Sequence, residues 1–250
     1  MRFVVVADRR TGTSLLLDTI NSHPEVECVK RAFGLEKRVK NPTPDRHSGG
    51  YFLYRTRSLG RRWRHFTDRR ASIAGFLEED VFGSRRHLSA PGFRLLYGAA
   101  RIYPEITDWV LEHELRVIHL TRENLLKRLV SERTAPLHKM HHPREGAEIK
   151  TVKITLDSKE TLRTLERAAA KVEAMHERFA RLEPLHVVYE ELSANREHET
   201  YRVLDFLGVP TDRPVGSDLV KINPDSVAEL VENHEELCAA LAGTRFERFL

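Results

Sequence analysis

The sequence predicts an α/β protein built on a parallel sheet that helices cover on both faces. Three stretches support this prediction, because Phe3–Ala7, Arg116–Thr121 and Leu185–Tyr189 are short and apolar, as strands buried on both faces are. Segments with helical periodicity separate them, and such alternation favours a parallel sheet. The chain has 250 residues, 40% of them apolar, and no internal repeat, so we expect one domain over residues 1–250.

The remaining elements follow from periodicity and from residues that end helices. Helices are predicted at Thr13–Ser22, Ile106–His113, Glu123–Arg133, Ser158–Leu182, Arg196–Leu207 and Ser226–Leu241. Pro24 ends the first of them and Gly208 stops the fifth. Two weaker strands are expected at Phe93–Tyr97 and Thr151–Thr155, and Lys139–Glu148 is expected to be a loop.

The pattern is interrupted between residues 34 and 92. Asn41–Gly92 is rich in Arg, His, Gly and Ser and has weak periodicity, which predicts long loops and one or two irregular helices, for example Ala71–Val81. We expect this excursion to be a lid or an acceptor-binding segment.

Residues 55–70 of the excursion contain seven arginines: Arg55, Arg57, Arg61, Arg62, Arg64, Arg69 and Arg70. Such a run is usually a solvated charged face, but it could also attract an anionic ligand. Trp63 and Phe66 within it could stack on a ring. Single-stranded nucleic acid would fit this mixture too, but nothing else in the chain supports that partner.

Composition narrows the classes of function. The net charge is +4, a mild excess that is compatible with an anionic ligand and too weak to indicate nucleic-acid binding. Cys28 and Cys238 are the only cysteines, which favours a reducing compartment. No apolar run approaches the ~20 residues of a membrane helix, and Phe3–Ala7 is too short for a signal-peptide core. We therefore expect a cytoplasmic protein without a membrane span, and a homo-oligomer stays open.

A polar turn, DRRTGTS at residues 8–14, joins the first strand to the first helix and suits an anion. Backbone N–H groups at a helix start are unpaired, and the helix dipole favours negative charge there. Gly12 lets an anion approach the backbone, Thr13 and Ser14 add hydroxyl donors, and Arg9 and Arg10 add positive charge. The alternative is an ordinary strand–turn–helix with surface arginines.

This turn differs from the phosphate loop of nucleoside triphosphatases, G-x-x-x-x-G-K-[ST]. Gly12-Thr13-Ser14 matches the end of that motif, but Thr13 replaces the lysine and Ala7 replaces the first glycine. A kinase needs the lysine on the terminal phosphates and usually a Mg²⁺ site. An arginine two residues earlier, Arg10, could serve a phosphate-linked group without a metal.

The stretch Arg10-Thr11-Gly12-Thr13-Ser14-Leu15-Leu16, followed by a helix and His23-Pro24, resembles the 5′-phosphosulfate loop of sulfotransferases. These enzymes use 3′-phosphoadenosine 5′-phosphosulfate (PAPS), and the likeness is to a bacterial branch that acts on carbohydrates and small molecules. The resemblance implies a P-loop-like α/β sheet and contacts from Arg9 and from residues 10–15 to the phosphosulfate. It places Arg10 beside the breaking bond, where a fixed cation stabilises the transition state.

Two later segments resemble the same family. Arg122 follows the strand RVIHLT and precedes Ser131 by about two helical turns, as in the family's 3′-phosphate site, although a helix start with Arg122 in a salt bridge would look alike. Tyr189 in HVVYEEL matches an adenine-contacting position, or it packs on the core. The resemblance also suggests that Lys221 approaches the 3′-phosphate.

The pattern departs from the family at the general base. Sulfuryl transfer to a hydroxyl needs a group that takes the acceptor proton, and this branch often has a Glu in a G-E-x-F context. Here Arg31 stands at that position before Phe33, and arginine cannot act as a base. Glu36 is the nearest carboxylate that could substitute. The histidines of the excursion, His47, His65 and His87, are further candidates.

The resemblance therefore implies a PAPS-dependent sulfotransferase that acts on a small-molecule or carbohydrate hydroxyl, on an anionic acceptor or a neutral one, and releases adenosine 3′,5′-bisphosphate (PAP). Two alternatives stay open: a nucleotide-dependent phosphotransferase with a degenerate loop, and a non-catalytic PAPS- or PAP-binding protein. No metal is expected. His138, His141 and His142 lie in a Pro/Gly-containing loop without the regular pairing of a zinc-binding helix.

Overall fold

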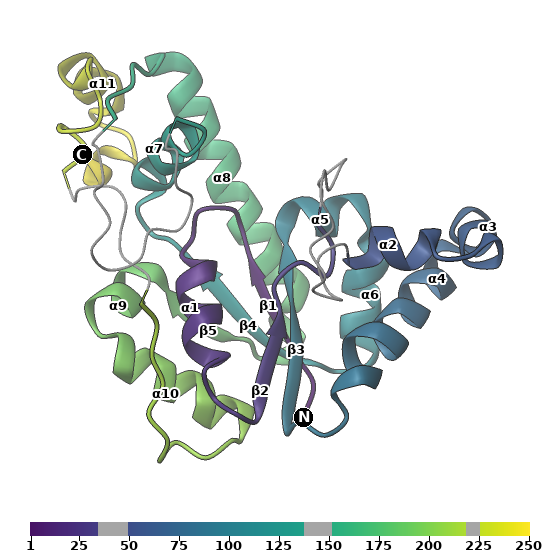
Figure 1. Cartoon of the computed structure of the whole chain (residues 1–250). Helices are drawn as coiled ribbons and strands as arrows, with labels where there is room; N and C mark the ends of the chain where they lie inside the picture. Colours follow the sequence, from purple (N-terminus) through teal and green to yellow (C-terminus); the bar gives the residue numbers. More distant parts are fainter. Residues whose placement is uncertain (35–49, 138–151, 219–225) are drawn as a thin grey trace.

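A computed structural model describes residues 1–34, 50–137, 152–218 and 226–250. Its centre is a five-stranded, all-parallel sheet in the order β2-β3-β1-β4-β5 (Figure 1). The strands are β1 (Phe3–Ala7), β2 (Val26–Val29), β3 (Ala90–Leu96), β4 (Arg116–Thr121) and β5 (Leu185–Val188). The predicted α/β class with a parallel sheet is confirmed.

Helices cover both faces of the sheet (Figure 1). On one face lie α1 (Thr13–Ile20), α9 (Tyr189–Ala194) and α10 (Arg196–Leu207). The other face packs against α4 (Arg69–Phe76), α5 (Tyr97–Ile102), α6 (Pro104–Glu112) and the end of α8 (Ser158–Phe179). A third apolar cluster joins α8 to α7 (Leu125–Thr134) and α11 (His234–Leu241). None of the described helices is long and apolar enough to cross a membrane.

The excursion contains more helix than its sequence predicts. Its described part holds α2 (Gly50–Thr56), α3 (Leu59–Thr67) and α4, which together project from the sheet and are called the arm below (Figure 1). A π-helical turn, Leu77–Phe82, and a 3-10 turn, Gly83–Arg85, lead back to the sheet. Ser58 and Asp68 cap α3 and α4 by accepting hydrogen bonds from backbone N–H groups, a local signal that the weak periodicity hid.

Strand β3 starts three residues earlier than predicted, because Ala90-Pro91-Gly92 does not have the composition of a strand. These residues nevertheless pair with β2 and β1 in parallel register. A Cβ on Gly92 would lie 2.5 Å from the Phe3 ring, so the absent side chain makes room for a core aromatic. Strand β2 was not predicted at all, since it is only four residues long and contains Glu27.

Two predicted elements are wrong at their boundaries. The predicted strand at 151–155 is a single bridge in its described part, between Ile154 and Val231. The predicted C-terminal helix begins at His234 and not at Ser226, because turns occupy the preceding residues. By contrast, α10 has the predicted bounds and ends at Gly208 with φ 67°, the left-handed conformation that glycine accepts readily. The Lys139–Glu148 loop lies outside the described residues.

Candidate functional site

The turn after β1 adopts an unusual backbone at the carboxyl edge of the sheet. Arg10 has φ 64° and Gly12 has φ 83°, both left-handed. Glycine accepts this conformation without penalty, whereas a non-glycine residue there costs about 1–3 kcal/mol. Thr11 is buried, and its hydroxyl donates a hydrogen bond of 2.9 Å to the Asp8 carbonyl, which tightens the turn. The strained Arg10 is therefore held in place by the surrounding structure.

Helix α1 starts without a capping side chain. Its N-cap residue is Gly12, no side-chain cap is found among the described residues, and its first turn has no acidic residue. Side-chain oxygens of Asn124, Asp157 and Asn195 cap α7, α8 and α10. The unpaired N–H groups and the positive dipole end of α1 are thus available to an anion.

Five residues that sequence analysis selected from three separate segments meet at this helix start. Arg10 donates a hydrogen bond of 3.0 Å from Nε to Ser131 Oγ. Arg122 donates to the Arg10 carbonyl at 3.3 Å and lies 4.6 Å from the centre of the Tyr189 ring. The ring also packs on Gly12, where an added Cβ would lie 2.3 Å from Tyr189 Cδ2. We call Arg10, Gly12, Arg122, Ser131 and Tyr189 the loop site.

Burial lowers the pKa of both arginines of the loop site, so the fold makes their positive charge less favourable than it is in water. Burial, and then the neighbouring Arg9, lowers the pKa of Arg10. Burial also lowers the pKa of Arg122, although Tyr189 and Glu190 oppose the effect. The Arg202 guanidinium, in contrast, has a raised pKa because Glu199 bonds to it. Arg122 forms an ion pair of 3.7 Å with Glu190, as the alternative interpretation of this residue expected. A bound anion would add a second counter-charge at the loop site.

Arg128 is a further cation of this region that sequence analysis missed. It is buried on α7, forms an ion pair of 3.3 Å with Asp8 and donates to the Arg9 carbonyl at 3.5 Å. It therefore braces the turn from behind. Its spacing of three residues before Ser131 places both side chains on one helix face, a signal that was readable in the sequence.

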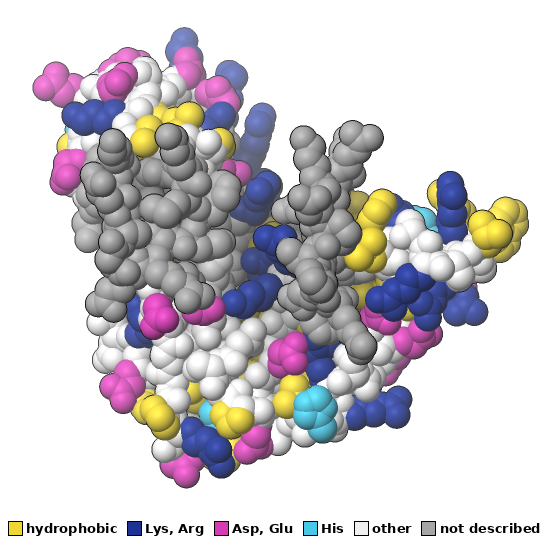
Figure 2. Space-filling view, viewed as in Figure 1, with side chains coloured by type: hydrophobic (Ala, Val, Ile, Leu, Met, Phe, Trp, Pro, Cys, Tyr) yellow, Lys and Arg dark blue, Asp and Glu magenta, His cyan; other side chains and the backbone are white. Residues whose placement is uncertain are grey.

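Arg94 is a second missed cation, on β3 beside the turn. Burial lowers the pKa of its guanidinium, and the positive charges of Arg31 and Arg9 lower it further. Arg31, the residue at the position of the family's expected Glu, is exposed just after β2. These three arginines make the edge next to the loop site cationic. In Figure 2, Lys and Arg side chains gather in the hollowed middle of the visible face.

Arg122 also lines a cavity of about 220 Å³. Its lining includes Arg245 and Arg248 and two aromatic rings, Phe246 and Phe249, from the C-terminal segment. The Arg245 guanidinium lies 5.0 Å from the centre of the Phe246 ring, and the Arg248 guanidinium lies 5.1 Å from the centre of the Phe249 ring. A ligand held at Arg122 could extend into this cavity and meet both charge and aromatic surface.

The other predicted site residues divide into those near the turn and those that the structure does not describe. Arg9 is exposed in the turn, Thr13 is buried, and Ser14 and Leu15 are half-buried in the first turn of α1. Glu36, the expected base, and Lys221 lie outside the described residues, as do His47, His138, His141 and His142.

Two histidines considered as the base have other surroundings. His65 belongs to the arm, where its ring nitrogens form hydrogen bonds with the side chains of Tyr51 and Arg55. His87 precedes β3 at Ala90, so it lies at the amino end of the sheet, opposite the loop site.

Comparison with known proteins supports the fold. A solved sulfotransferase from Alicyclobacillus acidocaldarius is 18% identical to this chain and superposes with a TM-score of 0.50. The match covers 95% of this chain and 89% of that protein. No family model matches the sequence, and no curated protein is similar to it. The chain thus has a sulfotransferase-like fold. An identity of 18% shows the fold and not the activity.

Proposed function

We propose that this protein is a sulfotransferase that moves the sulfuryl group of PAPS to a hydroxyl of a small molecule or carbohydrate. Arg10 contacts both Ser131 and Arg122 beside an uncapped helix start, and this arrangement supports the proposal most directly. PAPS has a phosphosulfate at one end and a 3′-phosphate at the other, so two cations at fixed separation suit it better than a nucleotide with one phosphate group.

The roles of the residues follow from their positions. The N–H groups of the α1 start and Thr13 would bind the 5′-phosphosulfate, and Arg122 with Ser131 would bind the 3′-phosphate. Arg10 would lie near the oxygen that bridges phosphorus and sulfur. As the acceptor oxygen bonds to sulfur, the bond from sulfur to this bridging oxygen breaks, and negative charge grows where Arg10 can stabilise it.

The acceptor side remains a separate part of the proposal. The acceptor proton must pass to a base, and Glu36 is the residue that the sequence offers for this role. Arg31 and Arg94 beside the turn favour an acceptor that carries a carboxylate, phosphate or sulfate. A panel of hydroxyl acceptors with and without such a group tests this preference.

Calorimetry with PAP tests the donor site. PAP should bind more tightly than AMP, which lacks the 3′-phosphate. Arg122→Ala should weaken PAP by about 100-fold, since it removes bonds between charged groups, and should weaken AMP much less. Arg133→Ala is the matched control, because Arg133 lies on the adjacent helix, is exposed and pairs with Glu160. Equal affinities of the wild type for PAP and AMP would refute the donor assignment.

Arg31 supports one second candidate, a PAPS- or PAP-binding protein without transferase activity. This candidate predicts tight PAP binding and no release of PAP from PAPS with any acceptor in the panel. The phosphotransferase alternative predicts Mg²⁺-dependent ATP binding, which the threonine at position 13 disfavours. Turnover and an ATP titration with Mg²⁺ separate the three functions.

A further inference from the structure

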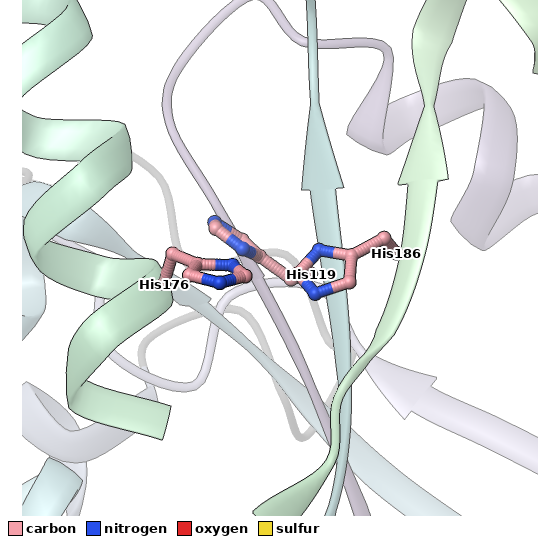
Figure 3. Close-up of side chains that lie close together, drawn as sticks. All are labelled: His119, His176 and His186. Carbon is pink, nitrogen blue, oxygen red and sulfur yellow. The ribbon is translucent and has the colours of Figure 1, made fainter. Parts of the chain in front are cut away.

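Three histidines from different elements converge on the sheet face that α8 covers (Figure 3). His119 lies on β4 and is paired in register with His186 on the edge strand β5, so both side chains point to the same face. His176 comes from the last turn of α8. The ring centres of His176 and His186 are 4.8 Å apart, and those of His119 and His186 are 5.6 Å apart.

Small side-chain rotations would bring the nitrogen atoms of this cluster to the spacing of a metal site. One ring nitrogen from each histidine lies within 4.8 Å of the others. Zinc–nitrogen bonds of about 2.0–2.1 Å in a tetrahedral site place ligand nitrogens roughly 3.4 Å apart. His176 and His186 are exposed and can rotate toward a common centre, whereas His119 is buried and supplies a fixed point.

Tyr97 orients the buried histidine. Its hydroxyl lies 2.6 Å from His119 Nε2, and both side chains are buried. A hydroxyl that accepts the Nε2 proton leaves Nδ1 as the nitrogen that can bind a cation, which is the arrangement found behind metal-binding histidines. Burial and the two neighbouring imidazoles lower the pKa of His119 to about 4, so the ring is neutral at neutral pH, as a metal ligand must be.

We propose that His119, His176 and His186 bind a divalent transition-metal ion of the zinc class, with the fourth position open to solvent. Three imidazoles suit Zn²⁺, Ni²⁺, Co²⁺ or Cu²⁺, and without a carboxylate among the three ligands the site disfavours Mg²⁺ and Ca²⁺. The ion would tie the end of α8 to the edge strand. This metal site does not depend on the proposed sulfuryl transfer, and the ion takes no part in that reaction.

The test is titration of tag-free, chelator-treated full-length protein with Zn²⁺, followed by calorimetry, and with Co²⁺, followed by visible absorption. We expect one ion per chain and the absorption of a tetrahedral Co²⁺ complex. His176→Gln and His186→Gln should each weaken binding by more than about 10-fold, and the double variant should abolish it. Zn²⁺ should raise the melting temperature of the wild type but not that of the double variant.

His198→Gln is the matched control, because His198 is also an exposed histidine and lies outside the cluster. It should bind Zn²⁺ as the wild type does. Circular dichroism of the metal-free variants checks that they fold, which the exposure of His176 and His186 leads us to expect. Binding that persists in the double variant would assign the ion to other histidines, such as His138, His141 and His142, and would overturn the proposal. Absence of binding to the wild type would overturn it equally.

Discussion

The loop site and the arm use the same residue types in opposite ways. Arginines of the loop site are half-buried, and burial lowers the pKa of Arg10 and of Arg122 although Arg122 forms an ion pair of 3.7 Å with Glu190. Arginines of the arm mostly form ion pairs with carboxylates of neighbouring elements. The pairs are Arg57–Asp80, Arg61–Glu79, Arg69–Glu105 and Arg70–Glu112.

This difference teaches how to interpret a run of arginines. The arm has seven arginines in sixteen residues, yet its ion pairs offset much of that charge locally, as in an ordinary solvated face. The loop site has fewer arginines, but the fold concentrates them at one helix start. Local density of positive charge in the sequence therefore identified the arm, whereas the arginines whose pKa burial lowers, Arg10 and Arg122, lie at the sheet edge.

The arm differs also in its apolar surface. Leu59, Trp63 and Phe66 of α3 are 83%, 71% and 73% exposed, and α3 has no buried residue. Figure 2 shows hydrophobic and basic side chains side by side at the outer end of the arm. Tyr189 in the loop site instead packs on Gly12 and Arg122, so its aromatic ring is already part of a built structure.

The largest effect is expected from Arg10→Gly. It removes the proposed transition-state cation, so turnover of PAPS should fall by about 10²–10³-fold. The free energy of unfolding should change little, because glycine accepts the left-handed φ of 64° at this position and this offsets the lost hydrogen bond to Ser131. Steady-state kinetics and urea unfolding measure the two quantities. Arg64→Gly in the arm is the comparison, and it should leave turnover unchanged; equal rate losses in both variants would break the distinction between the regions.

A large effect on acid stability is expected at His119. Its pKa is about 4 in the folded protein and 6.5 ordinarily, so between these values the unfolded chain binds more protons. The free energy of unfolding should therefore decrease by up to about 3 kcal/mol as the pH falls from 6.5 to 4. Urea unfolding of metal-free protein across this range measures the slope.

Two substitutions identify the source of this slope. His119→Gln should flatten the pH dependence, although His186 keeps a small part of it, because burial and the nearby His176 also lower the pKa of His186. His65→Gln in the arm should leave most of the slope intact, since His65 is only half-buried. Parallel pH profiles for the wild type and His119→Gln would show that another group is responsible.

An intermediate effect is expected from one glycine in each region. Gly12→Ala forces a Cβ into the Tyr189 ring at 2.3 Å and keeps a φ of 83°. We expect a loss of about 1–3 kcal/mol of stability and weaker PAP binding. Gly60→Ala in α3 meets nothing within 4 Å and should stabilise the protein by up to about 1 kcal/mol. Melting temperatures with and without PAP check both variants, and a stabilising Gly12→Ala would contradict the described packing.

The smallest effect is expected from Trp63→Ala in the arm. Its side chain is 71% exposed, so stability should change by no more than about 0.5 kcal/mol. PAP affinity should also stay the same, because α3 does not contribute to the loop site. Urea unfolding and calorimetry measure these values. A large loss of PAP affinity would mean that the arm closes over the donor site, and the comparison between the regions would need revision.

Sequence reasoning succeeded where a local pattern was sufficient. Buried strands such as β1 and β4 and the capped helix α10 were predicted with correct or nearly correct bounds, since apolar runs and a terminal glycine act within a few residues. It failed at β2 and at the start of β3, because Glu27 and Pro91 interrupt the pattern and only pairing with neighbouring strands makes these residues extended.

The sequence by itself determined the α/β class and the candidate donor residues, since each of Arg10, Arg122 and Tyr189 follows a recognisable strand. Only the tertiary structure decided that these residues touch, that Arg128 braces the turn, and that the arm's arginines form ion pairs. It also decided that three histidines, separated by up to 67 positions between His119 and His186, share one face. The physical reason is that parallel strand order and register, which depend on the whole sheet, determine which distant side chains become neighbours.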